Sequence, residues 1–180
     1  MFKKFNKQNN QNIKSGAGFS LIEMLVYVTI LSALFILVVN TLLVVNRSYS
    51  TIKVTNDINN SAIVSLERFV REIRLANSID LSDSVFGTNP GRLVLNTTDS
   101  IGNPLILDFY VESNDLKLKK DGVLSGSLIL DDVDITNLVF INTSTTTSSS
   151  VKIEMTLETS NKGANKSEKF YSSAVLRGSY

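Results

Sequence analysis

The sequence predicts an α+β protein in which one long N-terminal α-helix packs, through its second half, on an antiparallel β-sheet. Two features of the chain support this prediction. A long apolar stretch begins at Phe19 and passes into a segment whose apolar residues recur every three or four positions, which is the period of a helix. From residue 79 onward the apolar residues fall in short runs bounded by turn residues, as strands do. A helix packed against antiparallel strands is an α+β arrangement.

The first 18 residues form a polar segment whose four charged side chains are all lysines. This composition buries no apolar face and resists helix formation, so we expect residues 1–18 to be a flexible leader. The whole chain has a formal charge of +1; without the leader, 14 of the 18 basic residues remain against 17 acidic ones, which gives −3. We therefore expect no nucleic acid among the partners.

Residues 19–46 are almost entirely apolar and contain one carboxyl group, that of Glu23. From Met24 to Asn46 no residue is charged, and a helix of this length spans about 34 Å, enough to cross a hydrocarbon core of about 30 Å. Its 15 Leu, Ile, Val and Phe side chains favour insertion by roughly 5 to 9 kcal/mol, against a cost of roughly 3 kcal/mol for one acid. We predict a single membrane-spanning segment.

The lysines before this segment place its N-terminus in the cytoplasm by the positive-inside rule, and the C-terminal domain on the opposite side of the membrane. A secretory signal peptide would have a shorter apolar stretch followed by a small-residue cleavage site, and no such site follows here. A plain single-pass anchor remains an alternative that hydropathy does not distinguish.

Residues 47–78 predict an amphipathic continuation of the helix, to about 60 residues in all. We expect residues 62–76 to pack on the globular domain and residues 46–60 to be more exposed. The residues assigned to the apolar face recur in steps of three and four: Ile52, Thr55, Asn59, Ala62, Leu66, Phe69, Ile73 and Ala76.

Residues 79–180 predict the antiparallel sheet of a globular domain. Turn signals at Asn103-Pro104 and Asn114-Asp115 separate the first three expected strands. The expected strands lie at Leu93–Leu95, Leu105–Val111, Leu116–Leu118, Ile135–Ile141, Val151–Leu157 and Phe170–Leu176.

The absence of cysteine and histidine bears on chemistry. It removes disulfides, thiol nucleophiles, Cys/His zinc sites and the usual general base. No other pair of nucleophile and base stands at a recognisable spacing, so we expect a protein that is not an enzyme.

The most informative motif is Gly18-Phe19-Ser20-Leu21-Ile22-Glu23-Met24-Leu25, which follows the lysine-rich leader and opens the apolar segment. This order resembles the class III signal of type IV pilins and pseudopilins. The resemblance implies that a membrane prepilin peptidase cuts after Gly18 and that the new amino terminus, at Phe19, is N-methylated. Gly18 suits such a cut because a residue without Cβ lets a protease approach the backbone and interrupts the helix.

In that family the glutamate at the position of Glu23 pairs with the amino-terminal amine of a neighbouring subunit, so the resemblance makes Glu23 an assembly residue. An intramembrane acid usually has such a partner; snorkelling of Glu23 to the membrane interface is the alternative. The partners that the resemblance implies are prepilin peptidase, other pilin or pseudopilin subunits, inner-membrane assembly machinery and, before assembly, membrane lipid. The expected final location is a pilus or pseudopilus filament.

A weaker resemblance extends over residues 67–79, Leu107–Lys119, Val133–Phe140 and Ala174–Arg177, and is to J-type minor pseudopilins of type II secretion and W-type minor pilins. The chain has neither a proline near Asn40 nor cysteines for a C-terminal disulfide, which favours a minor over a major subunit. A major pilin, or a pilus-associated module that binds DNA or a surface, remains an alternative. The machine is left open among type II secretion, a type IV pilus and competence.

Three weaker signals lie in the sheet region. Asp131, Asp132 and Asp134 are a weak candidate for calcium, although the EF-hand pattern is absent; a solvated loop is the simpler interpretation. The low-complexity run from Asn142 to Ser150 predicts a hairpin loop. Lysines 117, 119 and 120 alternate with leucines and predict a solvated or edge-protecting face rather than an anion site.

Overall fold

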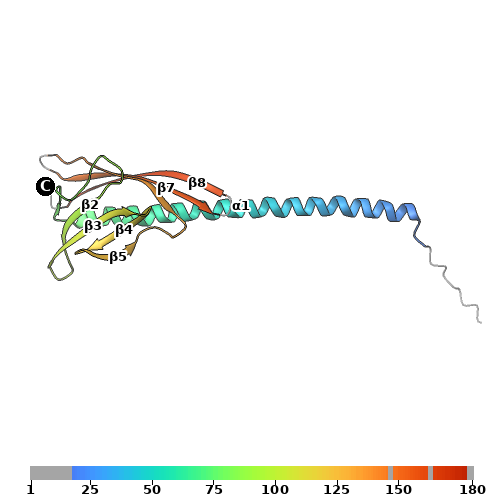
Figure 1. Ribbon diagram of the computed structural model, residues 1–180, viewed down its shortest axis with the longest axis horizontal. Coiled ribbons are helices and arrows are strands. Elements are labelled where there is room, and N and C mark those ends of the chain that lie inside the picture. Colours follow the sequence, from blue (N-terminus) through green and yellow to red (C-terminus); the bar gives the residue numbers. More distant parts are fainter. Residues whose placement is uncertain (1–17, 146–147, 162–163, 178–180) are drawn as a thin grey trace, which may run out of the picture. The chain divides into compact units, whose positions relative to one another are not determined.

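The computed structural model describes residues 18–145, 148–161 and 164–177. The chain divides into two compact units, one ending at Val44 and the other beginning at Val45, and each is described by itself. Among the described residues, helix α1 (Leu21–Leu75) is followed by strands and by no further helix, which confirms the predicted α+β class (Figure 1). The strands are β1 (Ser78–Ile79), β2 (Leu93–Thr98), β3 (Pro104–Glu112), β4 (Asp115–Lys120), β5 (Val123–Ser127), β6 (Asp134–Asn142), β7 (Ser150–Asn161) and β8 (Ala164–Val175).

The strands form two antiparallel sheets where the sequence predicted one. The first has the order β1-β2-β3-β4-β5 and the second the order β6-β7-β8. All six expected strands are present, whereas β1 and β5 were not expected. Strand β1 has only two residues, and β5 carries Gly126 and does not alternate in burial, so neither produces a recognisable sequence pattern.

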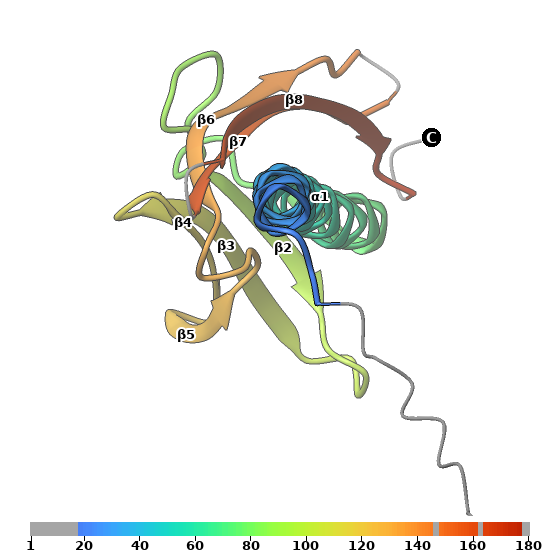
Figure 2. The same ribbon diagram turned by 90° about the vertical axis from the view of Figure 1, so that its right-hand side faces the viewer.

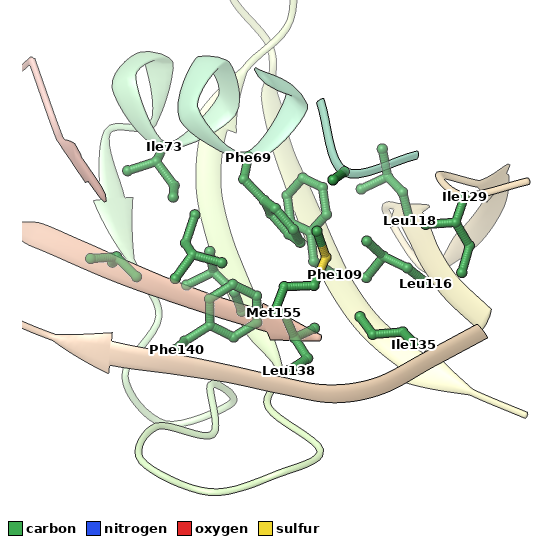
Figure 3. Packing of buried hydrophobic residues seen from close by; sticks show 14 of the residues in the cluster. Phe69, Ile73, Phe109, Leu116, Leu118, Ile129, Ile135, Leu138, Phe140 and Met155 are labelled. Atoms are coloured by element: carbon green, nitrogen blue, oxygen red, sulfur yellow. The ribbon is translucent and has the colours of Figure 1, made fainter. Parts of the chain in front are cut away.

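In the second unit, one face of α1 packs against both sheets, which lie on either side of that face (Figure 2). The alternating residues of β2, β3 and β4 and those of β6 and β7 bury their apolar side chains against the same helix. Phe69 of α1 is at the centre of this core, with its ring centroid 4.8 Å from that of Phe109 on β3 and 5.3 Å from that of Phe140 on β6 (Figure 3). One helical side chain therefore joins the helix to both sheets.

The buried face of the helix differs in part from the predicted one. Ala62, Phe69, Ile73 and Ala76 are buried as expected, but Ile52 is 59% exposed. Residues 46–60 are more exposed than residues 62–76, as expected, except at Val54 and Ile58, which are 2% and 0% exposed.

The second sheet explains this difference. Strands β7 and β8 have 12 residues each and form a long hairpin. Lys166, near the start of β8, donates a hydrogen bond from Nζ to Oγ1 of Thr55, and Lys53 lies 3.9 Å from Asp132 just before β6. The hairpin therefore reaches the part of α1 that contains Val54.

The connection between β1 and β2 ties the two sheets together. Phe86 bridges to Phe140 of β6, and the N–H of Gly87 donates to the Phe140 carbonyl at 2.8 Å. The N–H of Gly91 donates to the Leu138 carbonyl at 2.8 Å, and the Asn89 side chain accepts from the Leu138 N–H. A Cβ on Gly91 would lie 3.0 Å from the Leu138 oxygen, so any side chain here would force the neighbouring atoms to shift by a few tenths of an ångström, and glycine avoids this.

Candidate processing and assembly site

The expected cleavage site lies at the start of the described chain. Gly18, Phe19 and Ser20 precede α1 and are exposed, and Phe19 is 70% exposed. A Cβ built on Gly18 would meet no atom within 4 Å. The backbone at the Gly18–Phe19 bond is thus outside the helix and open to an approaching enzyme. The rest of the expected leader, residues 1–17, lies outside the described residues.

Ser20 occupies the N-cap position of α1. Its carbonyl accepts hydrogen bonds from the N–H groups of Glu23 at 3.0 Å and Met24 at 3.1 Å. Ser20 and Glu23 also match the S-x-x-E spacing of a capping box, a signal that the sequence analysis did not use. Glu23 lies in the first helical turn, where a negative charge is stabilised by the helix dipole.

Tyr27 contacts both of the predicted functional side chains. Its phenol donates a hydrogen bond to Oε1 of Glu23 at 3.2 Å, and its ring meets that of Phe19 edge-on with centroids 6.2 Å apart. Glu23 and Tyr27 are four residues apart and so lie on one helix face. Sequence reasoning did not single out Tyr27, although this spacing could have identified it. Glu23 therefore has a hydrogen-bond donor from its own helix.

The apolar part of α1 is long and apolar enough to cross a membrane, and none of its most apolar stretch is buried within the protein. Its hydroxyl side chains are satisfied locally: Thr29 donates to the Val26 carbonyl, Ser32 to that of Val28 and Thr41 to that of Leu37. Such bonds reduce the cost of placing hydroxyl groups in lipid.

The three aspartates of the calcium candidate are exposed and do not converge. Among the described residues, no group of three or more acidic side chains is arranged to hold a metal ion. Asp132 instead lies near Lys53 at 3.9 Å. The geometry gives the calcium hypothesis no support.

Two of the three lysines of β4, Lys117 and Lys119, have partners on neighbouring groups. Lys117 forms an ion pair with Glu112 at 2.7 Å, and Nζ of Lys119 lies 4.3 Å from the centre of the Tyr110 ring. The hydrogen bond between Lys117 and Glu112 lowers the pKa of Glu112 and raises that of Lys117. This arrangement agrees with a partly solvated face, but β4 lies between β3 and β5, so its lysines do not protect a sheet edge.

Comparison with known proteins gives no relative: no protein-family model, curated protein or solved structure matches this chain.

Proposed function

We propose that this chain is a minor subunit of a type IV pilus, type II secretion or competence pseudopilus filament. The observation that carries the proposal is the unit Gly18-Phe19-Ser20-Leu21-Ile22-Glu23 at the start of an unburied apolar helix. A plain membrane anchor has no need of a glycine before the apolar stretch or of a carboxylate inside it, since the acid costs roughly 3 kcal/mol in a membrane. In the proposed function, the glycine would serve processing and the carboxylate would serve assembly.

The first proposed step is cleavage by prepilin peptidase after Gly18, followed by N-methylation of Phe19. The exposed, non-helical backbone at Gly18 suits this reaction because proteases bind their substrates in an extended form. Cleavage would remove the four leader lysines and leave a chain with an amine at Phe19, one helical turn before Glu23.

The second proposed step is assembly through the apolar helix. In the membrane, lipid surrounds the helix, and Tyr27 supplies a hydrogen bond to the Glu23 carboxylate. In the filament, the Phe19 amine of a neighbouring subunit would become the ionic partner of Glu23. An unpaired charge in that apolar environment costs several kcal/mol, so the pair would select the correct axial position of the incoming subunit.

The minor-subunit assignment rests on the resemblance to J-type pseudopilins and W-type minor pilins. In this proposal the sheet domain contacts other minor subunits, and the inner-membrane assembly machinery inserts the chain into the filament. Lateral packing of apolar helices, rather than catalysis, is the mechanism.

The processing step is tested by intact mass and N-terminal sequencing of the protein from cells that contain an active prepilin peptidase. The expected product begins at N-methylated Phe19. A Gly18→Val variant should retain its leader, because the branched side chain obstructs access to the bond, whereas Gly16→Val is a matched control that should still be cut. Recovery of the uncut wild-type chain from such cells would refute the processing claim.

The assembly step is tested by substitutions of Glu23. Glu23→Ala should insert as well as or slightly better than the wild type, because a penalty of roughly 3 kcal/mol is removed. It should be cleaved normally but enter filaments poorly. Glu23→Gln should behave in the same way because it has no charge, and Glu23→Asp should be intermediate because its side chain is one methylene shorter.

The measurement is co-purification of each variant with the other filament subunits at matched membrane levels, with processing checked by mass. If Glu23→Ala enters filaments as well as the wild type, the carboxylate is not an assembly residue.

A further inference from the structure

A cationic groove lies between the end of α1 and strand β8. It has a volume of about 590 Å³. Leu66, Val70 and Leu75 of the helix provide apolar lining, and Ser172 of β8 borders the opposite side. Leu66 and Val70 are half-buried against the core, whereas Leu75 is 55% exposed. The groove belongs entirely to the sheet-bearing unit.

Three arginines surround this apolar lining: Arg71, Arg74 and Arg177. Arg177 is held in place because its N–H donates to the Arg74 carbonyl at 3.3 Å and the preceding residue, Leu176, is buried.

Within the described part of the chain, none of the three guanidinium groups has an ion pair or hydrogen bond. Arg68, one turn away, differs from them because it pairs with Glu72 at 2.9 Å. Glu67 is the acidic residue of the lining, so the groove has an excess of positive charge.

The edge of a sheet borders the same groove. In the order β6-β7-β8, strand β8 pairs with β7 along all 12 of its residues, and no described strand pairs with its other side. Figure 2 shows β8 passing beside α1 at the border of the second sheet. An unpaired edge presents backbone N–H and C=O groups that an extended peptide can use.

From these observations we propose that the groove docks an extended segment of a partner protein in which apolar and acidic residues alternate. The backbone of the segment would pair with the free edge of β8. One set of alternating side chains would lie over Leu66 and Val70, and carboxylates would meet Arg71, Arg74 and Arg177. The inference uses the sheet-bearing unit alone and does not depend on the proposed filament function.

An anionic lipid is the competing ligand for an arginine-rich apolar groove. Arg71 lies 25 residues beyond Asn46, where the apolar stretch ends, which is about 37 Å of helix. A lipid headgroup also does not form the strand-type backbone hydrogen bonds that a free strand edge offers. Both facts favour a peptide.

The test measures binding of a fluorescent peptide, acetyl-Val-Glu-Val-Asp-Val-Glu-Val-amide, to the full chain in detergent micelles. Fluorescence anisotropy gives the affinity, and hydrogen exchange reports protection of β8. We expect a dissociation constant below about 1 mM and slower exchange in β8. The same peptide with lysine at its acidic positions should not bind, and N-methylation of alternate amides should abolish binding because it removes strand pairing.

Variants locate the site. Arg71→Gln and Arg177→Gln should each weaken binding about tenfold, whereas Arg71→Lys should retain part of the affinity because it keeps the charge. Lys120→Gln removes the same charge from an exposed position on β4 and should leave affinity unchanged. Equal thermal unfolding of all variants would show that none acts through loss of folding.

Three results would overturn the proposal. The peptide could fail to bind at 1 mM, bind equally well when N-methylated, or respond equally to Arg71→Gln and Lys120→Gln. Short-chain phosphatidylglycerol is tested separately, below its critical micelle concentration. If it slows hydrogen exchange in the groove and the peptide does not bind, the groove is a lipid site instead.

Discussion

Replacement of Phe69 by alanine should destabilise the sheet-bearing unit more than replacement of an exposed residue of the same helix. Phe69 is fully buried and meets the rings of Phe109 and Phe140 at 4.8 and 5.3 Å, so it contacts both sheets. A buried Phe→Ala change costs about 3–5 kcal/mol in total, and the two lost ring pairs, at about 0.5–1.5 kcal/mol each, place this site in the upper part of that range. We therefore expect a loss of about 4–5 kcal/mol, a large part of the total stability of a domain.

The assay is pulse proteolysis of the full chain in mild detergent over a urea series, which follows unfolding of the sheets while the apolar helix stays in the micelle. Phe69→Leu should cost about 1–2 kcal/mol, since leucine keeps much of the apolar area but neither ring contact. Val64→Ala, at a position 57% exposed, should change stability by less than about 0.5 kcal/mol. A loss below about 2 kcal/mol for Phe69→Ala, or an equal loss for Val64→Ala, would refute this account of the core.

Three further predictions follow from single contacts. Tyr27→Phe removes the hydroxyl that donates to Glu23 but keeps the ring beside Phe19. We expect unchanged processing and severalfold weaker co-purification with filament subunits. In a Glu23→Gln background the substitution should cause no additional loss of co-purification, and an additional loss would show that Tyr27 acts independently of the carboxylate. The pKa of Asp99 is lowered mainly by the hydrogen bond from the N–H of Asn103. The Asp99 carboxylate should therefore stabilise the β2–β3 turn at pH values above its unfolded pKa of about 3.8, and this stabilisation should be lost as the pH falls through the lower pKa of the folded state. Urea titrations of wild type and Asp99→Asn should therefore differ near neutral pH and converge at about pH 2, and a difference that stays constant would exclude the ionic explanation. Gly91→Ala should lower the urea midpoint by the equivalent of about 1–3 kcal/mol, because its Cβ would lie 3.0 Å from the Leu138 oxygen and the Phe140 ring; an unchanged midpoint would show that the loop can move away from β6 at no cost.

The sequence was most informative where structure depends on near neighbours along the chain. The uninterrupted helix from Leu21 to Leu75 follows from apolar composition and from the absence of proline and glycine. The six expected strands follow from two-residue alternation between turn residues. At the candidate site, Gly18, Phe19 and Glu23 were identified from their order in the sequence, and the S-x-x-E and four-residue spacings could also have identified Ser20 and Tyr27.

Other features depended on contacts between distant segments. The division into two sheets, the docking of Gly91 on Leu138 and the burial of Val54 in place of Ile52 each involve partners many residues away. Periodicity predicts that a helix has an apolar face, but it does not distinguish Val54 from Ile52, since both are apolar. The position of the β7–β8 hairpin decides which of the two side chains is buried.

The cationic groove depends both on local helix periodicity and on contacts between distant segments. The sequence alone determined that Arg71 and Arg74 lie in the last turns of an amphipathic helix, because that depends only on local period. Only the tertiary structure placed Arg177, about a hundred residues later in the chain, beside them and next to the free edge of β8. The physical reason is that local backbone geometry is encoded by neighbouring residues, whereas the pairing of distant segments is decided by which arrangement buries the most apolar surface with its backbone hydrogen bonds satisfied.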